Sequence, residues 1–292
     1  MTHSRRDIVE LLERHGLAPR RAFGQNFVAD PNTVRRIARM AAGTGDLTGT
    51  HVIEIGAGLG SLTLALAETG ARITAIEIDH GLVPVLREVV SRSPVTVRVV
   101  EGDARELDWD DIIEPGTTAT VVANLPYNVA TPLVADLLDT VPAITRFVVM
   151  VQKEVALRLA ASPGSSDYGT VSVMVSYWGS ARVLGDVSPS VFVPRPKVTS
   201  SIVEITRSPQ PAVGPHVGID VTPDRLFGVV RAAFGQRRKM LRRSLAQLAT
   251  PDTFARAGVD PMARPEDLDV MQWGRLAAAV HDRPESPADH TA

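Results

Sequence analysis

Between residues 51 and 207 the chain alternates short apolar runs with segments of helical periodicity. Five runs rich in Val and Ile have the length of strands, at 51–56, 72–79, 95–103, 118–124 and 144–152. Helical segments follow the first, second and last of them. Because these runs are continuously apolar, we expect strands that are buried on both faces. The pattern predicts an α/β fold with a parallel, doubly wound sheet.

Two later runs, 171–179 and 200–207, indicate a β-hairpin or a pair of edge strands. The segment 208–220 is rich in Pro and Gly and is typical of a linker. We expect helices beyond it at 222–233, 237–248, 251–257 and 272–281. The predicted organisation is an α/β domain over 1–208 with a helical extension at 1–45, a helical domain over 209–281, and a disordered tail at 282–292.

Composition narrows the class of protein. The 292 residues are 44% hydrophobic, which is typical of a soluble globular protein, and no apolar run is long enough to span a membrane. The N-terminus lacks the apolar core of a signal peptide. The absence of cysteine excludes disulfides, Cys-ligated zinc and thiol catalysis, and favours a cytoplasmic protein. The seven His show no ligand spacing, so no metal is expected.

The charge is unevenly distributed along the chain. The net charge of −2 does not by itself suggest a nucleic-acid partner. Residues 225–243, however, hold seven Arg or Lys and no acid, and residues 1–39 hold eight Arg against four acids. A phosphate backbone responds to such a local field. A basic binding face is therefore expected, and an ordinary solvated face is the alternative.

A glycine-rich turn follows the first predicted strand in the stretch EIGAGLG. Gly56 and Gly58 allow a tight turn and a close approach of the backbone to a ligand. Such a turn can also serve only to pack a helix on a strand. Glu77 ends the second strand and Asp103 follows the third, and parallel strands bring both acids to the same edge of the sheet. Together these residues predict a cleft for a ribose.

The spacing of the glycines helps to distinguish two nucleotide ligands. A dinucleotide site has the pattern G-x-G-x-x-G and binds a pyrophosphate. Here the pattern is G-x-G-x-G, a form used with a preceding acid in S-adenosylmethionine binding. Glu54 and Glu77 supply hydrogen-bond acceptors, which suit a ligand without phosphate. The predicted cofactor is S-adenosylmethionine.

The stretch NLPY lies at the end of the fourth predicted strand, at the same edge of the sheet. Pro126 has a fixed φ and favours an extended Leu125. The Leu125 carbonyl and the Asn124 side-chain oxygen can then accept the two hydrogens of an exocyclic amine. Tyr127 offers a flat face, and stacking of a base on an aromatic ring is worth roughly 1–3 kcal/mol. A plain turn between strand and helix is the alternative.

At this point the chain resembles a known family. The stretches GQNFV, EIGAGLG, EID, GDA, NLPYNV, VFVPRPKVTSSI and FGQRRKMLRRSL occur in the order seen in small-subunit rRNA adenine dimethyltransferases. The resemblance spans roughly residues 20–280. It implies a Rossmann-like class I methyltransferase domain followed by a small all-helical domain. It also implies dimethylation of the N6 amines of two adjacent adenosines in the 3′-terminal hairpin loop of small-subunit rRNA during ribosome biogenesis.

The resemblance further implies a cofactor site. Asn26 and Val28 would line its methionine end, and Gly56 and Gly58 would form the loop. Glu77 would then hold the ribose and Asp103 the cofactor adenine.

The target site would use a second set of residues. Asn124 and the Leu125 carbonyl would bind the amine of the target adenine, with Pro126 shaping the loop and Asn124 also bordering the cofactor. Tyr127 would stack on the base, and Phe192 would close its opposite face. Core packing is the alternative for Phe192. The RNA would contact the basic residues Arg237, Arg238, Lys239, Arg242 and Arg243.

Two other functions remain open at this stage. A large-subunit rRNA adenine methyltransferase of the macrolide-resistance type shares the N-terminal motifs. A non-catalytic ribosome-assembly or RNA-binding factor could keep the fold, although Asn124, Tyr127, Gly56 and Glu77 are intact. The expected partner is the rRNA within a 30S or pre-30S particle, and we expect a monomer.

Overall fold

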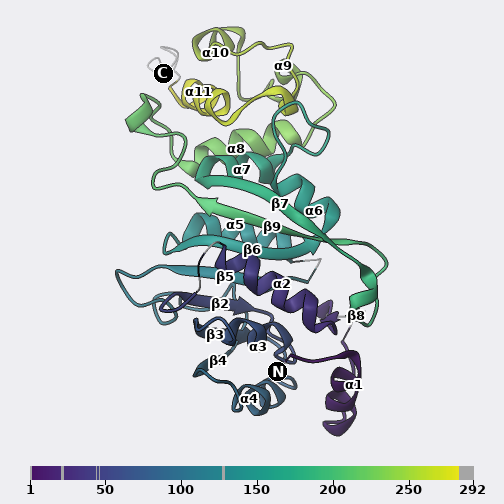
Figure 1. Cartoon of the computed structure of the whole chain (residues 1–292). Coiled ribbons are helices and arrows are strands. Elements are labelled where there is room, and N and C mark those ends of the chain that lie inside the picture. The colour runs from purple at the N-terminus through teal and green to yellow at the C-terminus, as the bar shows by residue number, and fades with distance from the viewer. Residues whose placement is uncertain (1, 21–22, 44, 46, 127–128, 283–292) are drawn as a thin grey trace, which may run out of the picture. The chain divides into compact units, whose positions relative to one another are not determined.

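The computed structural model in Figure 1 describes residues 2–20, 23–43, 45, 47–126 and 129–282. The chain divides into two compact units. The first comprises the chain up to Ala160 together with Ser180–Arg207, and the second comprises Ala161–Gly179 together with the chain from Ser208. The second unit thus includes a segment that precedes the boundary expected at residue 208. In the described ranges no helix has the length and apolar character needed to cross a bilayer.

A seven-stranded sheet forms the centre of the first unit, with the strand order β4-β3-β2-β5-β6-β9-β7. The neighbours from β4 to β6 are parallel, and β9 is antiparallel to β6. The strands are β2 (His51–Ile55), β3 (Arg72–Glu77), β4 (Val97–Glu101), β5 (Ala119–Asn124), β6 (Ile144–Gln152), β7 (Gly179–Val187) and β9 (Ser200–Arg207). The five predicted parallel strands are confirmed. Their order brings the carboxyl ends of β2, β3 and β5 together at one edge of the sheet.

Helices cover the central strands of this sheet, which are apolar on both faces. On one face, Ile37 of α2 and Leu66 of α3 pack in a single cluster with Val122 of β5. The neighbouring Val121 points to the opposite face and is also buried. The helices of the first unit are α1 (Arg5–Arg14), α2 (Pro31–Ala42), α3 (Ser61–Ala67), α4 (Val83–Val90), α5 (Ala130–Thr140) and α6 (Lys153–Leu159). The prediction of an α/β fold is confirmed. Double burial is confirmed for β2 and β5 but not for the edge strand β4, which contains no buried residue.

The segment 171–179 was expected as a strand, and this prediction is wrong. It forms helix α7 (Thr170–Trp178), while the edge strand begins one residue later at Gly179. Val173 and Tyr177, four residues apart on one face of α7, are buried in the core of the second unit. Such packing outweighs the strand propensity of the β-branched residues in this run, which periodicity could not distinguish from a buried helix.

The second unit is helical, as expected. Its core gathers around the buried Trp273 and Phe227. Its helices are α7, α8 (Pro223–Phe234), α9 (Leu241–Ser244), α10 (Pro251–Ala257) and α11 (Val270–His281). The helix predicted over 237–248 is reduced to the four residues of α9, because residues 235–239 form turns. Of the predicted RNA-binding residues, Arg237, Arg238 and Lys239 therefore lie in the connection between α8 and α9, and only Arg242 and Arg243 are helical.

Candidate active site

The glycine turn after β2 is held by the neighbouring strand. The backbone N–H groups of Gly56 and Ala57 donate to the Ile76 carbonyl of β3 at 2.9 and 3.1 Å. Gly58 has a φ of +58°, and a Cβ added there would lie 3.2 Å from the Phe27 ring. A left-handed backbone and close packing thus both require glycine at this position.

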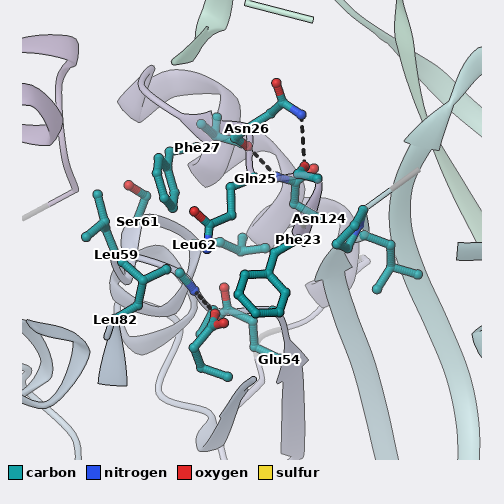
Figure 2. A pocket seen from close by; sticks show the side chains of 18 of the residues that line it. Phe23, Gln25, Asn26, Phe27, Glu54, Leu59, Ser61, Leu62, Leu82 and Asn124 are labelled. Carbon is teal, nitrogen blue, oxygen red and sulfur yellow. Dashed lines mark hydrogen bonds between the residues drawn. The ribbon is translucent and has the colours of Figure 1, made fainter. Parts of the chain in front are cut away.

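A cleft opens above this turn at the carboxyl edge of the sheet (Figure 2). The residues predicted for the methionine end and the ribose all line it, namely Asn26, Val28, Gly56, Gly58 and Glu77. They come from three separate parts of the chain. Val28 belongs to β1 (Phe27–Val28), which pairs with β8 (Phe192–Val193) in a second, two-stranded sheet. The structure therefore brings this predicted set together.

A second cavity contains the residue predicted for the cofactor adenine. Asp103 lines it beside Arg105 and Val129. Phe23 and Ile78 line both this cavity and the cleft, so the two spaces share a wall. A ligand that extends from the glycine turn toward Asp103 would pass along Phe23 and Ile78.

Two buried carboxylates give the cleft its electrostatic character. Burial raises the pKa of Glu54 to about 8, and the charge of nearby Glu77 acts in the same direction. The Oε2 atom of Glu54 is buried and has no hydrogen-bond partner within the described part of the chain. Burial also raises the pKa of Glu77, against the opposing effect of backbone hydrogen bonds. The two acids thus make the cleft suitable for a ligand with hydroxyl groups or a positive charge.

Glu77 is fixed by backbone donors. Its Oε2 accepts the Gly58 N–H at 2.7 Å, and its Oε1 accepts the Asp79 N–H at 2.8 Å. Each carboxylate oxygen has a second lone pair that a ribose hydroxyl can use. The glycine turn and the acid therefore form one hydrogen-bonded unit rather than two independent features.

Asp103 differs from Glu54 and Glu77 because it forms an ion pair with Arg105. The guanidinium of Arg105 donates to both of its oxygens, from Nη2 at 2.6 Å and from Nε at 3.2 Å. These hydrogen bonds lower the pKa of Asp103 below its usual range. The carboxylate is thereby held as an ionised acceptor at the far end of the site.

Asn124 is oriented by a contact that the sequence did not reveal. Its side-chain Nδ2 donates to the Asn26 carbonyl at 3.0 Å, and the Asn26 side chain in turn donates to the Gly24 carbonyl (Figure 2). Because a carbonyl only accepts, the amide nitrogen must face Asn26. The Asn124 side-chain oxygen is thereby left as the acceptor that the target-site hypothesis requires.

The rest of the NLPY stretch is placed only in part. Leu125 and Pro126 line the cleft beside Asn124, and the Leu125 N–H donates to the Met150 carbonyl at 3.0 Å. The Pro126 carbonyl accepts from Val129 and Ala130 at the start of α5. Tyr127 lies outside the described residues, so its stacking role stays a prediction.

Phe192 is not among the residues that line the cleft. Its side chain is 1% exposed and packs in the core cluster that contains Val28 and Ile37. Its backbone pairs with Val28, and its carbonyl accepts from Arg5 at 3.0 Å. In this structure its ring makes the core contacts that were the alternative for this residue, and a role beside a target base stays a prediction.

Several residues of the cleft were missed by the site predictions. Phe23 directly precedes the GQNFV stretch, Gln25 is its second residue, and Ser61 opens α3 directly after the glycine turn (Figure 2). Their proximity to recognised motifs was the only signal in the sequence. Glu54 was expected as an acceptor because of its motif, but its complete burial depends on the fold.

The predicted RNA-binding residues lie in the second unit and differ in their exposure to solvent. Arg238, Lys239, Arg242 and Arg243 are exposed. Arg237 instead donates to the Ser166 carbonyl at 2.6 Å and lies 3.7 Å from a Glu266 oxygen. Arg237 is therefore bound within its own unit, whereas the other four are open to solvent. The described residues contain no group of three or more potential metal ligands.

The fold and the cleft together define a Rossmann-like, S-adenosylmethionine-dependent methyltransferase. The sequence profile of the ribosomal RNA adenine dimethylase family matches residues 16–282. The chain belongs to this family.

Relatives and solved structures agree with this assignment. The chain is 46% identical to ribosomal RNA small subunit methyltransferase A of Rhodospirillum rubrum over 93% of this chain and 91% of the relative. It is 42% identical to the protein of the same name from Bifidobacterium adolescentis over 94% and 93%. The structure of the 23S rRNA methyltransferase ErmE is 26% identical with a TM-score of 0.64, covering 87% of this chain and 99% of that one. A dimethyladenosine transferase from Plasmodium falciparum has a TM-score of 0.68 at 23% identity, covering 85% and 94%, and supports the fold.

Proposed function

We propose that this chain dimethylates the N6 amines of two adjacent adenosines in the 3′-terminal hairpin loop of small-subunit rRNA, with S-adenosylmethionine as the methyl donor. The observation that carries the proposal is the composition of the cleft wall. Within the described residues this wall contains the buried Glu54 and Glu77 together with Asn124, and it contains no Arg or Lys.

That wall fits S-adenosylmethionine better than a dinucleotide. A pyrophosphate would oppose the ionisation of these two buried acids, whereas a ribose can form hydrogen bonds with them and a cationic ligand would favour their ionised form. The Oε2 of Glu54 has no hydrogen-bond partner among the described residues and can form a hydrogen bond with a hydroxyl group of such a ligand. When bound, the cofactor supplies a methyl group activated by a positively charged sulfur.

The residues around Asn124 would bind and orient the target amine. The Asn124 side-chain oxygen and the Leu125 carbonyl can each accept one of its hydrogens, which favours a nitrogen whose lone pair is directed away from both acceptors. Positioning of two reactants can contribute up to roughly 7–11 kcal/mol to lowering a barrier. A base must leave its stack to enter such a cleft, so an adenosine in an unpaired loop is the suitable substrate.

The choice of small-subunit rRNA rests on the relatives. The proteins 42–46% identical over nearly the whole chain are named small-subunit methyltransferases, whereas the 23S rRNA enzyme is 26% identical. This difference favours the small subunit over the macrolide-resistance type. We further propose that the protein acts as a monomer in the cytoplasm on a 30S or pre-30S particle.

The test is transfer of labelled methyl groups to 30S particles that lack these methylations, followed by mass mapping of the modified nucleosides. We expect N6,N6-dimethyladenosine at two adjacent positions near the 3′ end of the rRNA. A parallel reaction offers unmethylated 23S rRNA, and methyl transfer to that RNA without transfer to the 30S particles would favour the large-subunit alternative. Binding of the particle without any methyl transfer would favour a non-catalytic assembly factor.

A further inference from the structure

We propose that Asp79 is a positioning residue for the cofactor, because it binds the turn that carries Phe23 and Gln25 into the cleft wall. This inference rests on the proposed binding of S-adenosylmethionine. Asp79 itself does not line the cleft, and none of the site predictions included it.

Asp79 is a buried carboxylate with three donors. Its Oδ1 accepts from Arg20 Nη1 at 3.1 Å and from the Gly81 N–H at 3.0 Å, and its Oδ2 accepts from Gln25 Nε2 at 2.8 Å. The side chain is 4% exposed. A buried carboxylate with this number of donors holds its partners firmly, since separation would leave the charge unsatisfied.

The two side chains bound by Asp79 belong to one compact turn. The Arg20 carbonyl accepts the N–H groups of Phe23 and Gln25 at 3.2 and 3.4 Å. The Arg20 N–H donates to Gln25 Oε1 at 2.7 Å. Arg20 and Gln25 are thus linked to each other as well as to Asp79. We call Arg20, Gln25 and Asp79 the Asp79 cluster.

This cluster determines where two walls of the cofactor site lie. Gln25 lines the cleft, and Phe23, in the same turn, lines both the cleft and the cavity of Asp103. On the other side, the Asp79 N–H donates to Glu77, the predicted ribose acceptor. Asp79 therefore connects the ribose-binding acid of β3 to a chain segment more than 50 residues earlier. Loss of the cluster should weaken cofactor binding more than it changes the acceptors for the target amine, because the Asn26 carbonyl that orients Asn124 does not bond to a member of the cluster.

The experiment measures the S-adenosylmethionine Kd of the full chain by calorimetry, together with KM and kcat for methyl transfer to under-methylated 30S particles. In Asp79→Asn, which keeps the side-chain volume but removes the charge, we expect Kd and the cofactor KM to rise about tenfold. We expect kcat at saturating cofactor to stay within threefold. Arg20→Ala should raise Kd severalfold, and Arg20→Lys should recover part of the loss.

Arg14→Ala is the matched control. It removes a different ion pair of the N-terminal segment, with Glu88 of α4 at 3.8 Å, at a residue that does not line the cleft. Its Kd should equal that of the unsubstituted protein. Arg20 is 44% exposed, so its variants test the proposal even where Asp79→Asn does not fold. Kd values within twofold of the unsubstituted protein in Asp79→Asn and Arg20→Ala, or an equal rise in Arg14→Ala, would overturn the role of Asp79. Failure of the unsubstituted protein to bind S-adenosylmethionine would instead overturn the proposed function.

Discussion

In the cleft of the first unit, Glu54 and Glu77 are almost fully buried, and backbone donors fix Glu77 in place. In the basic stretch of the second unit, Arg238 and Arg242 are exposed and make no ion pair with the described residues. Buried polar groups depend on the precise positions of their hydrogen-bond partners, and the loss of a partner costs a large free energy. Exposed cations act through their summed field, which salt screens. Substitutions in the two regions should therefore differ in size and in their response to salt.

The largest effect is expected at Glu77. Glu77→Gln replaces an acceptor that holds the Gly58 and Asp79 N–H groups, so it should disturb both the loop and the ribose site. We expect the S-adenosylmethionine Kd to rise about 100-fold, equivalent to roughly 2.7 kcal/mol. The matched control is Glu101→Gln, since Glu101 pairs with Glu77 in register on β4 but is exposed. A similar rise in both variants would show that the effect is not local to the cleft.

The next effect concerns Asn124, the predicted acceptor for the target amine. Asn124→Ala should reduce methyl transfer at saturating cofactor at least tenfold, with little change in cofactor Kd. Labelled transfer and calorimetry on the same preparation separate the two quantities. Asn32→Ala, an exposed position at the start of α2, should leave both unchanged. Normal turnover in Asn124→Ala would contradict the proposed role of Asn124 as an acceptor.

A pH-dependent effect follows from Glu54. Its pKa in the folded protein is raised to about 8, whereas in the unfolded chain it is near 4.5. Between these values the folded state binds more protons than the unfolded state, so stability should fall as the pH rises from about 5 to 8. This group contributes at most about 1.4 kcal/mol per pH unit to that slope.

Glu54→Gln should reduce the slope, as measured by denaturant unfolding without cofactor at several pH values. The exposed Glu13→Gln is the control and should keep the slope of the unsubstituted protein. An identical slope in Glu54→Gln and the unsubstituted protein would contradict the assigned ionisation.

The smallest effects per residue are expected in the basic stretch. Arg238→Gln and Arg242→Gln should each weaken binding of the rRNA hairpin severalfold and reduce the salt slope by about one. Arg237→Gln should mainly lower stability, by about 1 kcal/mol, because Arg237 bonds Ser166 within its own unit. Filter binding at several salt concentrations and thermal unfolding distinguish these outcomes. An unchanged salt dependence of RNA binding in Arg238→Gln and Arg242→Gln would indicate that these residues form an ordinary solvated face.

The prediction from sequence worked where a local rule determines position. Val and Ile runs separated by helices specify a parallel sheet, and the order of its strands brings Gly58 and Glu77 to one edge. It failed where packing decides between equally apolar structures. Residues 170–178 are a helix because Val173 and Tyr177 bury one face in the second unit. The helix predicted over 237–248 is present only as α9, with turns on both sides of it.

The class of fold, the glycine turn and the acids at the strand ends could be read from the sequence, because apolar runs and the residues that follow them are local features of the chain. Only the tertiary structure decided which polar groups act together. The contacts of Asn124 with Asn26 and of Asp79 with Gln25 join residues 98 and 54 positions apart. The tertiary structure also buries Phe192 in the core and raises the pKa of Glu54. Burial and long-range hydrogen bonds depend on the whole packed chain, so no local pattern in the sequence encodes them.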